Sequence, residues 1–367
     1  MSFEGHGLFV GAHPTQDRKR SAQALRWAQM TTLLTDIGAA TLRWLATAAF
    51  DGTLFAALCW LMSVTLLRRA GGRVLALLWL AALLRFVVWR PLELHAVPLE
   101  AVLRDAPQRA SAATASWFAC GYAAILSAIV LSVLVRQHLL LRSVVELLPA
   151  EAAISACVRV AAQQLALSRT PSVRVTTQSV PPFCVGTLWP TLVLPQWLCE
   201  PGPRLHAVLL HELAHLERRD QFAIWVERAV VCLFYFWPPV HWVTRKLKEA
   251  RELACDERAI ERGAFDTSEY ASHLLEVVAR SRGRVAYEAL AIGRTGTRLE
   301  RRIDQLLEDG SPRKPSLRHD AVLIVLLMAA LVGFRPQPAA PSVADRRPAS
   351  FDDGGCDEPD VSLQCGP

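Results

Sequence analysis

The chain has 367 residues, of which 52% are hydrophobic, and it carries a net charge of +6 at pH 7. This length fits two or three domains, and the hydrophobic share is high for a soluble protein. The basic balance does not indicate direct nucleic-acid binding, because there is no zinc-finger spacing and the arginines cluster beside apolar segments, as they do beside anionic lipid headgroups. None of the nine cysteines forms a C-x-x-C pair, which excludes a zinc ribbon and a thioredoxin motif.

Four apolar segments in chain order predict an α-helical integral membrane protein with about four spans. They cover residues 52–67, which extend back to about 44 if Asp51 is tolerated, then 74–89, 117–135 and 321–334. About 20 apolar residues are needed to cross a hydrocarbon core of about 30 Å, and the last segment is shorter than this. One such segment is also typical of a buried core helix, but four in one chain favour the membrane interpretation.

The distribution of arginines predicts how these spans are oriented. Residues 68–73 contain three arginines and no acid, and residues 136–142 contain two more arginines, so both links are expected on the cytoplasmic side. DRKR at residues 17–20 argues against an external N-terminus, so the side of the N-terminus stays open. The predicted organisation is an N-terminal extension at 1–43, spans one and two at 44–92, an external loop at 93–115, span three at 116–137, a cytoplasmic domain at 138–318, span four at 319–334 and an external disordered tail at 335–367.

The predicted cytoplasmic domain mixes helices and strands. Residues 146–166 alternate at helical spacing, and residues 172–180 alternate with a period of two, which is typical of a strand. Residues 181–195, PPFCVGTLWPTLVLP, are bounded by prolines and predict a hairpin whose second strand is 191–194. Residues 204–220 then predict an amphipathic helix.

This last helix contains HELAHLERRD, which begins at His211. His211 and His215 are four residues apart and therefore share one helical face, where both imidazoles can bind one metal ion. Zinc binds imidazole nitrogens at about 2.0–2.1 Å and keeps one position open for water in catalytic sites. Glu212 follows the first histidine and can act as general base on that water. The alternative is a surface helix whose charges lie on its polar side, so a third ligand is required.

Five downstream residues are candidates for the third ligand, and these are His241, Glu249, Glu252, Glu257 and His273. Arg218 and Gln221 occupy the positions where a three-histidine motif needs glycine and histidine, which excludes that motif. The best match is Glu252, because Asp256 lies four residues later on the same helical face and can accept the second ring proton of a ligand histidine. The alternative is an exposed helix rich in salt bridges. The predicted domain at 138–318 is therefore an α+β, zincin-like (H-E-x-x-H) metallopeptidase domain that binds Zn²⁺.

Three stretches resemble the BlaR/MecR family of membrane-embedded antirepressor metallopeptidases. They are HELAHLERRD at 211–220, FYFWPPVHW at 234–242 and RELACDE at 251–257, within a resemblance that covers roughly residues 44–334. The resemblance implies that His211, His215 and Glu252 bind zinc and that Glu212 is the catalytic base. VGTLWPTLVLP at 185–195 is similar to the family's hairpin before the catalytic helix. It implies strand addition of an extended substrate, for which the candidate residues are Thr191, Leu192, Val193 and Leu194.

The family resemblance implies a function but departs from the drug-sensing members in one respect. Those members carry a penicillin-binding domain after the last span, whereas only 33 residues and no S-x-x-K motif follow Phe334 here. The resemblance implies a signalling endopeptidase of the bacterial cytoplasmic membrane that cleaves a cytoplasmic regulator, such as a winged-helix repressor. The alternatives are a membrane quality-control peptidase and a non-catalytic transducer. The expected partners are a protein substrate, the lipid bilayer and a second copy of the chain.

The predicted tail contains two cysteines, Cys356 and Cys365, with eight residues between them. If span four exits the membrane, this tail lies in an oxidising compartment, where exposed cysteine pairs form disulfides. An intramolecular bond is therefore expected. The alternatives are two free thiols or a bond to another chain.

Overall fold

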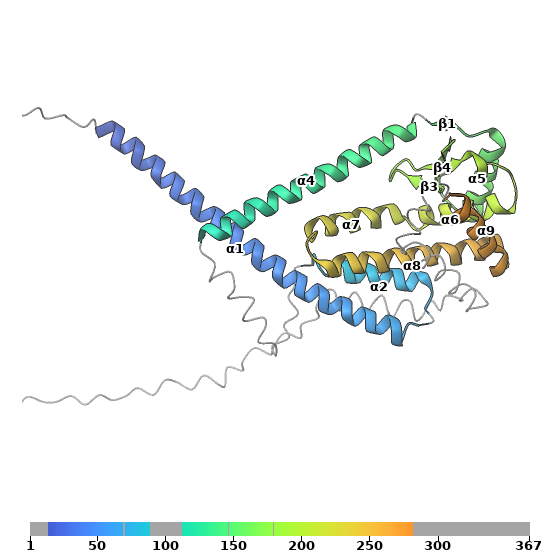
Figure 1. The fold of residues 1–367 in the computed structure, drawn as a ribbon, viewed down its shortest axis with the longest axis horizontal. Helices are drawn as coiled ribbons and strands as arrows, with labels where there is room; N and C mark the ends of the chain where they lie inside the picture. The colour runs from blue at the N-terminus through green and yellow to red at the C-terminus, as the bar shows by residue number, and fades with distance from the viewer. Residues whose placement is uncertain (1–13, 69, 89–111, 146, 179, 282–367) are drawn as a thin grey trace, which may run out of the picture.

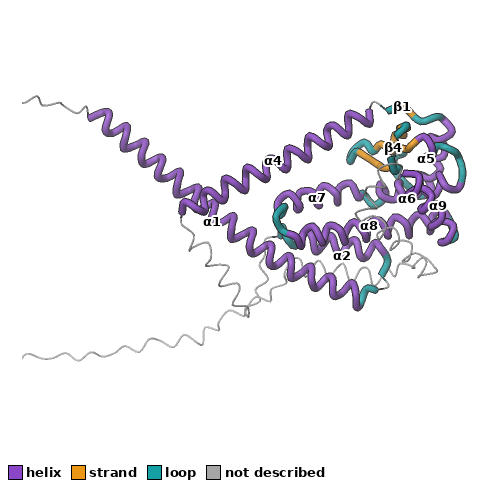
Figure 2. Tube along the Cα trace, in the orientation of Figure 1, coloured by secondary structure: helices purple, strands orange, loops and turns teal. Residues whose placement is uncertain are grey.

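The computed structural model describes residues 14–68, 70–88, 112–145, 147–178 and 180–281. The elements in chain order are the helices α1 (Pro14–Thr65), α2 (Gly72–Leu84) and α4 (Ala112–Val145), strand β1 (Leu148–Pro149), helix α5 (Ala152–Gln164), strands β2 (Ser172–Thr176), β3 (Phe183–Val185) and β4 (Thr191–Pro195), the short 3-10 helix η1 (Gln196–Leu198), and the helices α6 (Pro203–Glu217), α7 (Asp220–Leu233), α8 (Pro238–Gly263) and α9 (Thr267–Ser281). Figure 1 shows α1 and α4 crossing, while α2, α7 and α8 lie beside one another. The fold is mostly helical with a small sheet at one end (Figure 2).

Two described helices, α1 and α4, are long and apolar enough to cross a membrane. The qualifying stretches are Leu25–Thr65 and Trp117–Val145. The second of these contains the predicted span three, and none of its 18-residue apolar window is buried in the protein. Of the three expected spans that fall on described residues, these two helices correspond to the first and the third.

The prediction of a span within 74–89 is wrong. Helix α2 has only 13 residues, about 20 Å at 1.5 Å per residue, which is too short for the hydrocarbon core. Leu78, Ala82 and Leu83 are completely buried, and α2 packs along α8. An apolar run looks the same in sequence whether protein or lipid covers it, and here protein covers it. The predicted span at 319–334, most of the loop at 93–115 and the tail at 335–367 lie outside the described residues.

The sheet has the strand order β1-β2-β4-β3. β3 and β4 form the predicted antiparallel hairpin, with Cys184 opposite Leu192. β4 also pairs with β2 in parallel, and β1 pairs with β2 antiparallel. The predicted helix at 146–166 begins later, at Ala152, because β1 takes the preceding residues. β4 is therefore a central strand that fastens the hairpin to the rest of the domain.

The predicted helix at 204–220 is two helices in the structure. α6 ends at Glu217, and Arg219 adopts a left-handed conformation with φ of 56° before α7 begins at Asp220. This reversal turns the chain sharply after the second histidine of the motif. Because of this turn, Asp220 points back toward α6 and contacts His215. In one continuous helix, it would lie more than one turn beyond His215.

Candidate metal centre

The two histidines of the motif and one glutamate from α8 meet at one point. Each of these residues contributes one donor atom, and the three atoms lie within 4.8 Å of one another: they belong to His211, His215 and Glu252. His211 Nε2 is 3.8 Å from Glu252 Oε2. Two imidazoles and a carboxylate form a donor set typical of catalytic zinc sites, with a fourth position left for water.

A buried carboxylate fixes the ring of His211. Asp256 Oδ1 is 2.9 Å from His211 Nδ1, and Asp256 is completely buried. Tyr270 of α9 donates its hydroxyl to the same oxygen at 2.8 Å. When Nδ1 donates to Asp256, the lone pair of the neutral ring stands on Nε2, the atom that faces Glu252. Asp256 therefore occupies the position that the sequence predicted for a partner of a ligand histidine.

His215 has a corresponding partner, which the sequence pattern does not indicate. Asp220 Oδ2 lies 2.8 Å from His215 Nδ1, and Asp220 is 4% exposed. Burial alone would raise the pKa of Asp220, but the hydrogen bond with His215 and the charges of Arg218 and Arg251 outweigh it and lower the pKa. Asp220 is therefore ionised near neutral pH and can hold the His215 ring. The only sequence signal was its place in HELAHLERRD, since its contact depends on the turn at Arg219.

A second group of metal-binding atoms shares His215, with Asp220 and Cys255 as its other members. Cys255 Sγ is 3.3 Å from His215 Nδ1. Two observations favour a positioning role over a metal site here. Burial, followed by the charge of Asp220, raises the pKa of Cys255 well above its usual value, so the thiol stays protonated. Arg218 Nε also lies 3.5 Å from Asp220 Oδ1, which disfavours another cation beside it.

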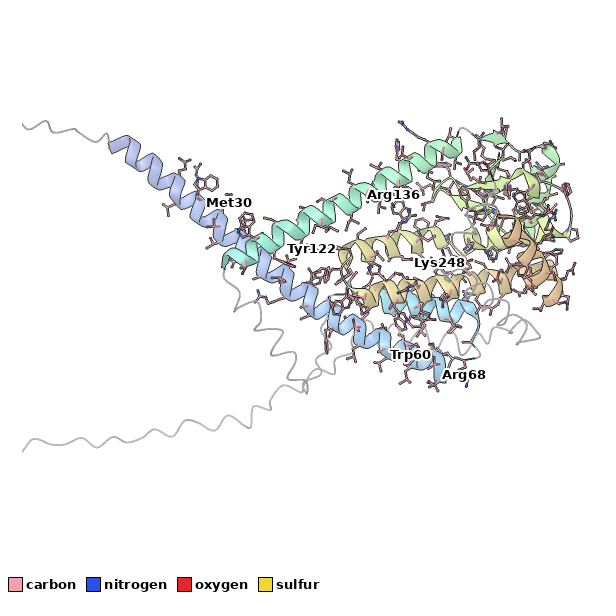
Figure 3. The ribbon with its side chains drawn as sticks, in the orientation of Figure 1. Met30, Trp60, Arg68, Tyr122, Arg136 and Lys248 are labelled. Carbon is pink, nitrogen blue, oxygen red and sulfur yellow. The ribbon has the colours of Figure 1, made fainter. Side chains whose placement is uncertain are left out.

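The converging donors open into a cleft of about 600 Å³ between β3, α6, α7, α8 and α9. Glu212 lines this cleft together with both histidines and Glu252. Lys248 also lines it and projects from α8, where Figure 3 labels it. The cleft is large enough for several side chains of a peptide, and it places Glu212 beside the donor atoms.

β3 forms one wall of the cleft, whereas β4 does not. Phe183 and Cys184 line the cleft. Gln221 Nε2 donates to the Cys184 carbonyl at 3.1 Å, and Cys184 Sγ donates to the Glu212 carbonyl at 3.6 Å, so β3 is fixed beside α6. Burial, and then the charge of Glu212, raises the pKa of the Cys184 thiol well above its usual value, which keeps it a neutral donor.

The substrate strand predicted at Thr191, Leu192, Val193 and Leu194 requires correction. These residues belong to β4, which is hydrogen-bonded to β2 on one side and to β3 on the other. Leu192, Val193 and Leu194 are also buried. Strand addition needs an unpaired edge, and among the described strands β3 has that edge next to the cleft.

The other predicted ligand candidates lie apart from the donor group. His241 Nε2 is bonded to the Tyr235 carbonyl at 2.9 Å, and Glu249 pairs with Lys246 at 2.8 Å. Glu257 accepts the backbone N–H of Gly72. His273 lines the cleft but is not in either donor group. The predicted disulfide between Cys356 and Cys365 lies outside the described residues.

A model of the BlaR1 peptidase M56 family matches residues 100–306. The chain belongs to this family. The match covers α4 through α9 and thus the whole cleft, and it confirms the BlaR/MecR resemblance of the sequence. No curated protein matches the chain. The family is one of membrane-associated metallopeptidases, so it implies a metal cofactor, a protein substrate and a role in signalling.

Proposed function

We propose that this protein is a zinc endopeptidase of a membrane signalling system and that it cleaves a cytoplasmic regulatory protein. The convergence of His211, His215 and Glu252, with a buried aspartate on the Nδ1 atom of each imidazole, carries this proposal. Such outer partners fix the ring orientation and raise the basicity of ligand histidines. A non-catalytic binding module would need neither partner, nor a glutamate beside the first ligand.

The residues divide the chemistry of peptide hydrolysis among them. His211, His215 and Glu252 would hold a zinc ion, which would supply a polarised water with a pKa near 7. Glu212 lines the cleft beside these residues, where its carboxylate can take the proton of a water that attacks the peptide carbonyl and can return a proton to the leaving amine. Asp220 and Asp256 hold the two imidazoles in place through their contacts with the Nδ1 atoms.

The substrate is an extended peptide beside β3 in this proposal. The outer edge of β3 adjoins the cleft, and main-chain hydrogen bonds along such an edge bind a strand with little dependence on side chains. The cleft walls then select side chains near the scissile bond. The hydrogen bonds of Cys184 with Glu212 and Gln221 fix the position of this edge relative to α6 and α7.

The arginine-rich segments 68–73 and 136–142 support a cytoplasmic position for the peptidase domain at 138–318. A regulator on that side, such as a winged-helix repressor, would be inactivated by one cut, which couples a membrane signal to transcription. The proposed location is the bacterial cytoplasmic membrane, with a homodimer as the assembly to test.

Replacing Glu212 by glutamine tests the mechanism, because the zinc ligands stay intact while the base is lost. We expect one zinc ion per chain in both proteins, and cleavage of a proteome-derived peptide library reduced at least ~100-fold in the variant. Zinc is measured by elemental analysis and the cleavage products by mass spectrometry. Glu200→Gln is the control, since the Glu200 side chain is exposed and lies 3.7 Å from Arg204. Wild-type cleavage by the Glu212 variant would disprove the role of the base.

A further inference from the structure

We propose that the tip of the β3–β4 hairpin and the outer face of α7 form a second membrane contact, which seats in the lipid headgroup layer beside the peptidase cleft. This interfacial surface consists of Leu188, Trp189, Phe222, Val226 and Ala229. Leu188 and Trp189 are 66% and 79% exposed, and Phe222 is 52% exposed. Large apolar side chains gathered on one surface mark a contact with a partner or a membrane.

The hairpin tip is a fixed structure that presents Leu188 and Trp189 outward. Gly186 turns the chain with φ of 92°, and a Cβ there would lie 2.4 Å from the Trp189 carbonyl oxygen. Trp225 of α7 donates its indole N–H to Thr187 Oγ1 at 3.1 Å. The tip is therefore tied to α7 within one helical turn of Phe222 and Val226, which makes the two exposed groups neighbours.

Helix α7 has two faces with different surroundings. Gln221, Ile224 and Arg228 line the cleft. Phe222, Val226 and Ala229 are exposed, and their spacing of four and three residues places them in one stripe. The exposed face of a helix in water usually carries charged residues, whereas this stripe has none. The apolar stripe therefore indicates a non-aqueous environment on the side of α7 that faces away from the cleft.

Contacts with α4 set the height of this surface relative to the membrane. Residues 117–135 of α4 carry no charge, and Arg136 is the first charged residue after them. Arg228 donates to Gln137 Oε1 at 2.9 Å and lies over the ring of Trp225 at 5.1 Å. The middle of α7 therefore stands where α4 leaves the hydrocarbon, close to Arg136 in Figure 3.

The C-terminal end of α7 lies beside the uncharged part of α4. Tyr122 donates its hydroxyl to the Leu233 carbonyl at 2.7 Å. Helix α7 thus runs from the apolar part of α4 up to its charged end, and the hairpin tip lies at the charged end. Tryptophan concentrates at this level of membrane proteins, and arginine there attracts anionic headgroups.

Contact of α7 with the candidate span α4 favours lipid as the occupant. Ile125, Leu131 and Leu134 on α4 are all exposed apolar residues within the candidate span. Helix α7 contacts α4 through Gln137 and Tyr122, and the exposed stripe of α7 is uncharged. With lipid on one face of α7 and the cleft on the other, a substrate reaches Glu212 from beside the membrane surface.

Photo-crosslinking of the full chain tests the contact without requiring peptidase activity. Benzoylphenylalanine replaces Trp189 in one variant, Leu131 in a second and Val160 of α5 in a third, each reconstituted in nanodiscs of phosphatidylethanolamine and phosphatidylglycerol. Leu131 lies in the candidate span and is 62% exposed, whereas Val160 is an exposed peptidase-domain residue at 51%. Lipid adducts are measured by mass spectrometry after illumination.

We expect the yield of lipid adduct at position 189 to be at least a third of that at 131 and at least tenfold above that at 160. A yield at 189 equal to that at 160, with lipid adducts at 131, would overturn the proposal. A crosslink from 189 to a second copy of the chain in place of lipid would also overturn it, since protein would then cover the surface.

Discussion

Two apolar cores share helix α8 but differ in what they contain. The first core holds the N-terminal half of α8 against α1, α2 and the end of α7. It contains several aromatic pairs, including Trp79 with Trp242 at 5.2 Å and Trp44 with Phe234 at 5.6 Å. The second core holds the C-terminal half of α8 against α5, α6, β4 and α9. Only the second core adjoins the metal centre, whose buried carboxylates it encloses.

Helix α8 contributes residues both to the first core and to the metal centre. α8 has 26 residues and is therefore about 39 Å long. Val240 and Val243 are completely buried in the first core, while Glu252 and Asp256 project from the half that belongs to the second. One continuous helix therefore connects the packing of α1 and α2 with two residues of the site.

The largest effect is expected from Glu252→Ala in the second core. Removing this carboxylate leaves two imidazoles as the only ligands from the chain, so zinc affinity should fall by more than the 10–100-fold typical of an outer partner. Glu249→Ala is the control, because Glu249 is one turn earlier on α8 and pairs with Lys246. Competition with a chelator measures the affinity. Normal zinc binding by the Glu252 variant would transfer the ligand role to another residue.

In the first core, Asp51→Ala should reduce stability strongly without changing zinc affinity. Asp51 pairs with Arg85 at 3.3 Å between α1 and α2, and the side chains are only 7% and 2% exposed. Removing one member leaves a buried charge, which costs about 3–5 kcal/mol of unfolding free energy. The midpoint of thermal unfolding in detergent measures this loss. The double variant Asp51→Leu with Arg85→Met should recover most of it, and failure to recover would show that the charge was not the cause.

A smaller effect on the metal is expected from the aspartates behind the imidazoles. Asp220→Ala and Asp256→Ala should each weaken zinc binding by about 10–100-fold, since the ring of His215 or His211 loses its orientation. Asp220→Asn and Asp256→Asn keep a hydrogen-bond acceptor and should recover part of the affinity. Chelator competition again provides the measurement. Equal affinities of the alanine variants and the wild type would contradict the positioning role.

The two cores also differ in how far the sequence predicts them. Helical periodicity suffices to bring His211 beside His215 and Glu252 beside Asp256, because both pairs depend only on local spacing. Asp220 escaped prediction since its contact with His215 depends on the left-handed turn at Arg219, which the helical pattern does not reveal.

Errors elsewhere have the same origin in long-range packing. The sequence pattern predicts a span at α2 because burial against α8 and burial in lipid select the same residues. Leu192 and its neighbours were assigned to an exposed strand because the pairing of β4 with β2 joins segments 19 residues apart. Strand order and helix partners are properties of the whole fold, whereas the sequence pattern is local.

The smallest effect on stability is expected at the contact between the start of α2 and the C-terminal half of α8, which carries Glu252 and Asp256. Gly72 begins α2, and a Cβ there would lie 2.3 Å from the backbone nitrogen of Ala254. Its N–H donates to both carboxylate oxygens of Glu257, at 2.9 and 3.0 Å, so the two helices must lie close together. Gly72→Ala should therefore force them apart and cost about 1–3 kcal/mol of unfolding free energy.

Gly121→Ala provides the matched control for this variant. Gly121 lies within α4, and a Cβ there would meet no described atom within 4 Å apart from the helix's own backbone. The same substitution should therefore be neutral or should stabilise the helix by up to about 1 kcal/mol. Thermal unfolding of both variants in detergent measures the difference. Because Ala254 lies between Glu252 and Asp256 in sequence, the Gly72 variant should also bind zinc more weakly than the Gly121 variant. If Gly72→Ala lowers stability while zinc affinity stays unchanged, then α2 supports the first core alone and α8 does not transmit its position to the metal centre.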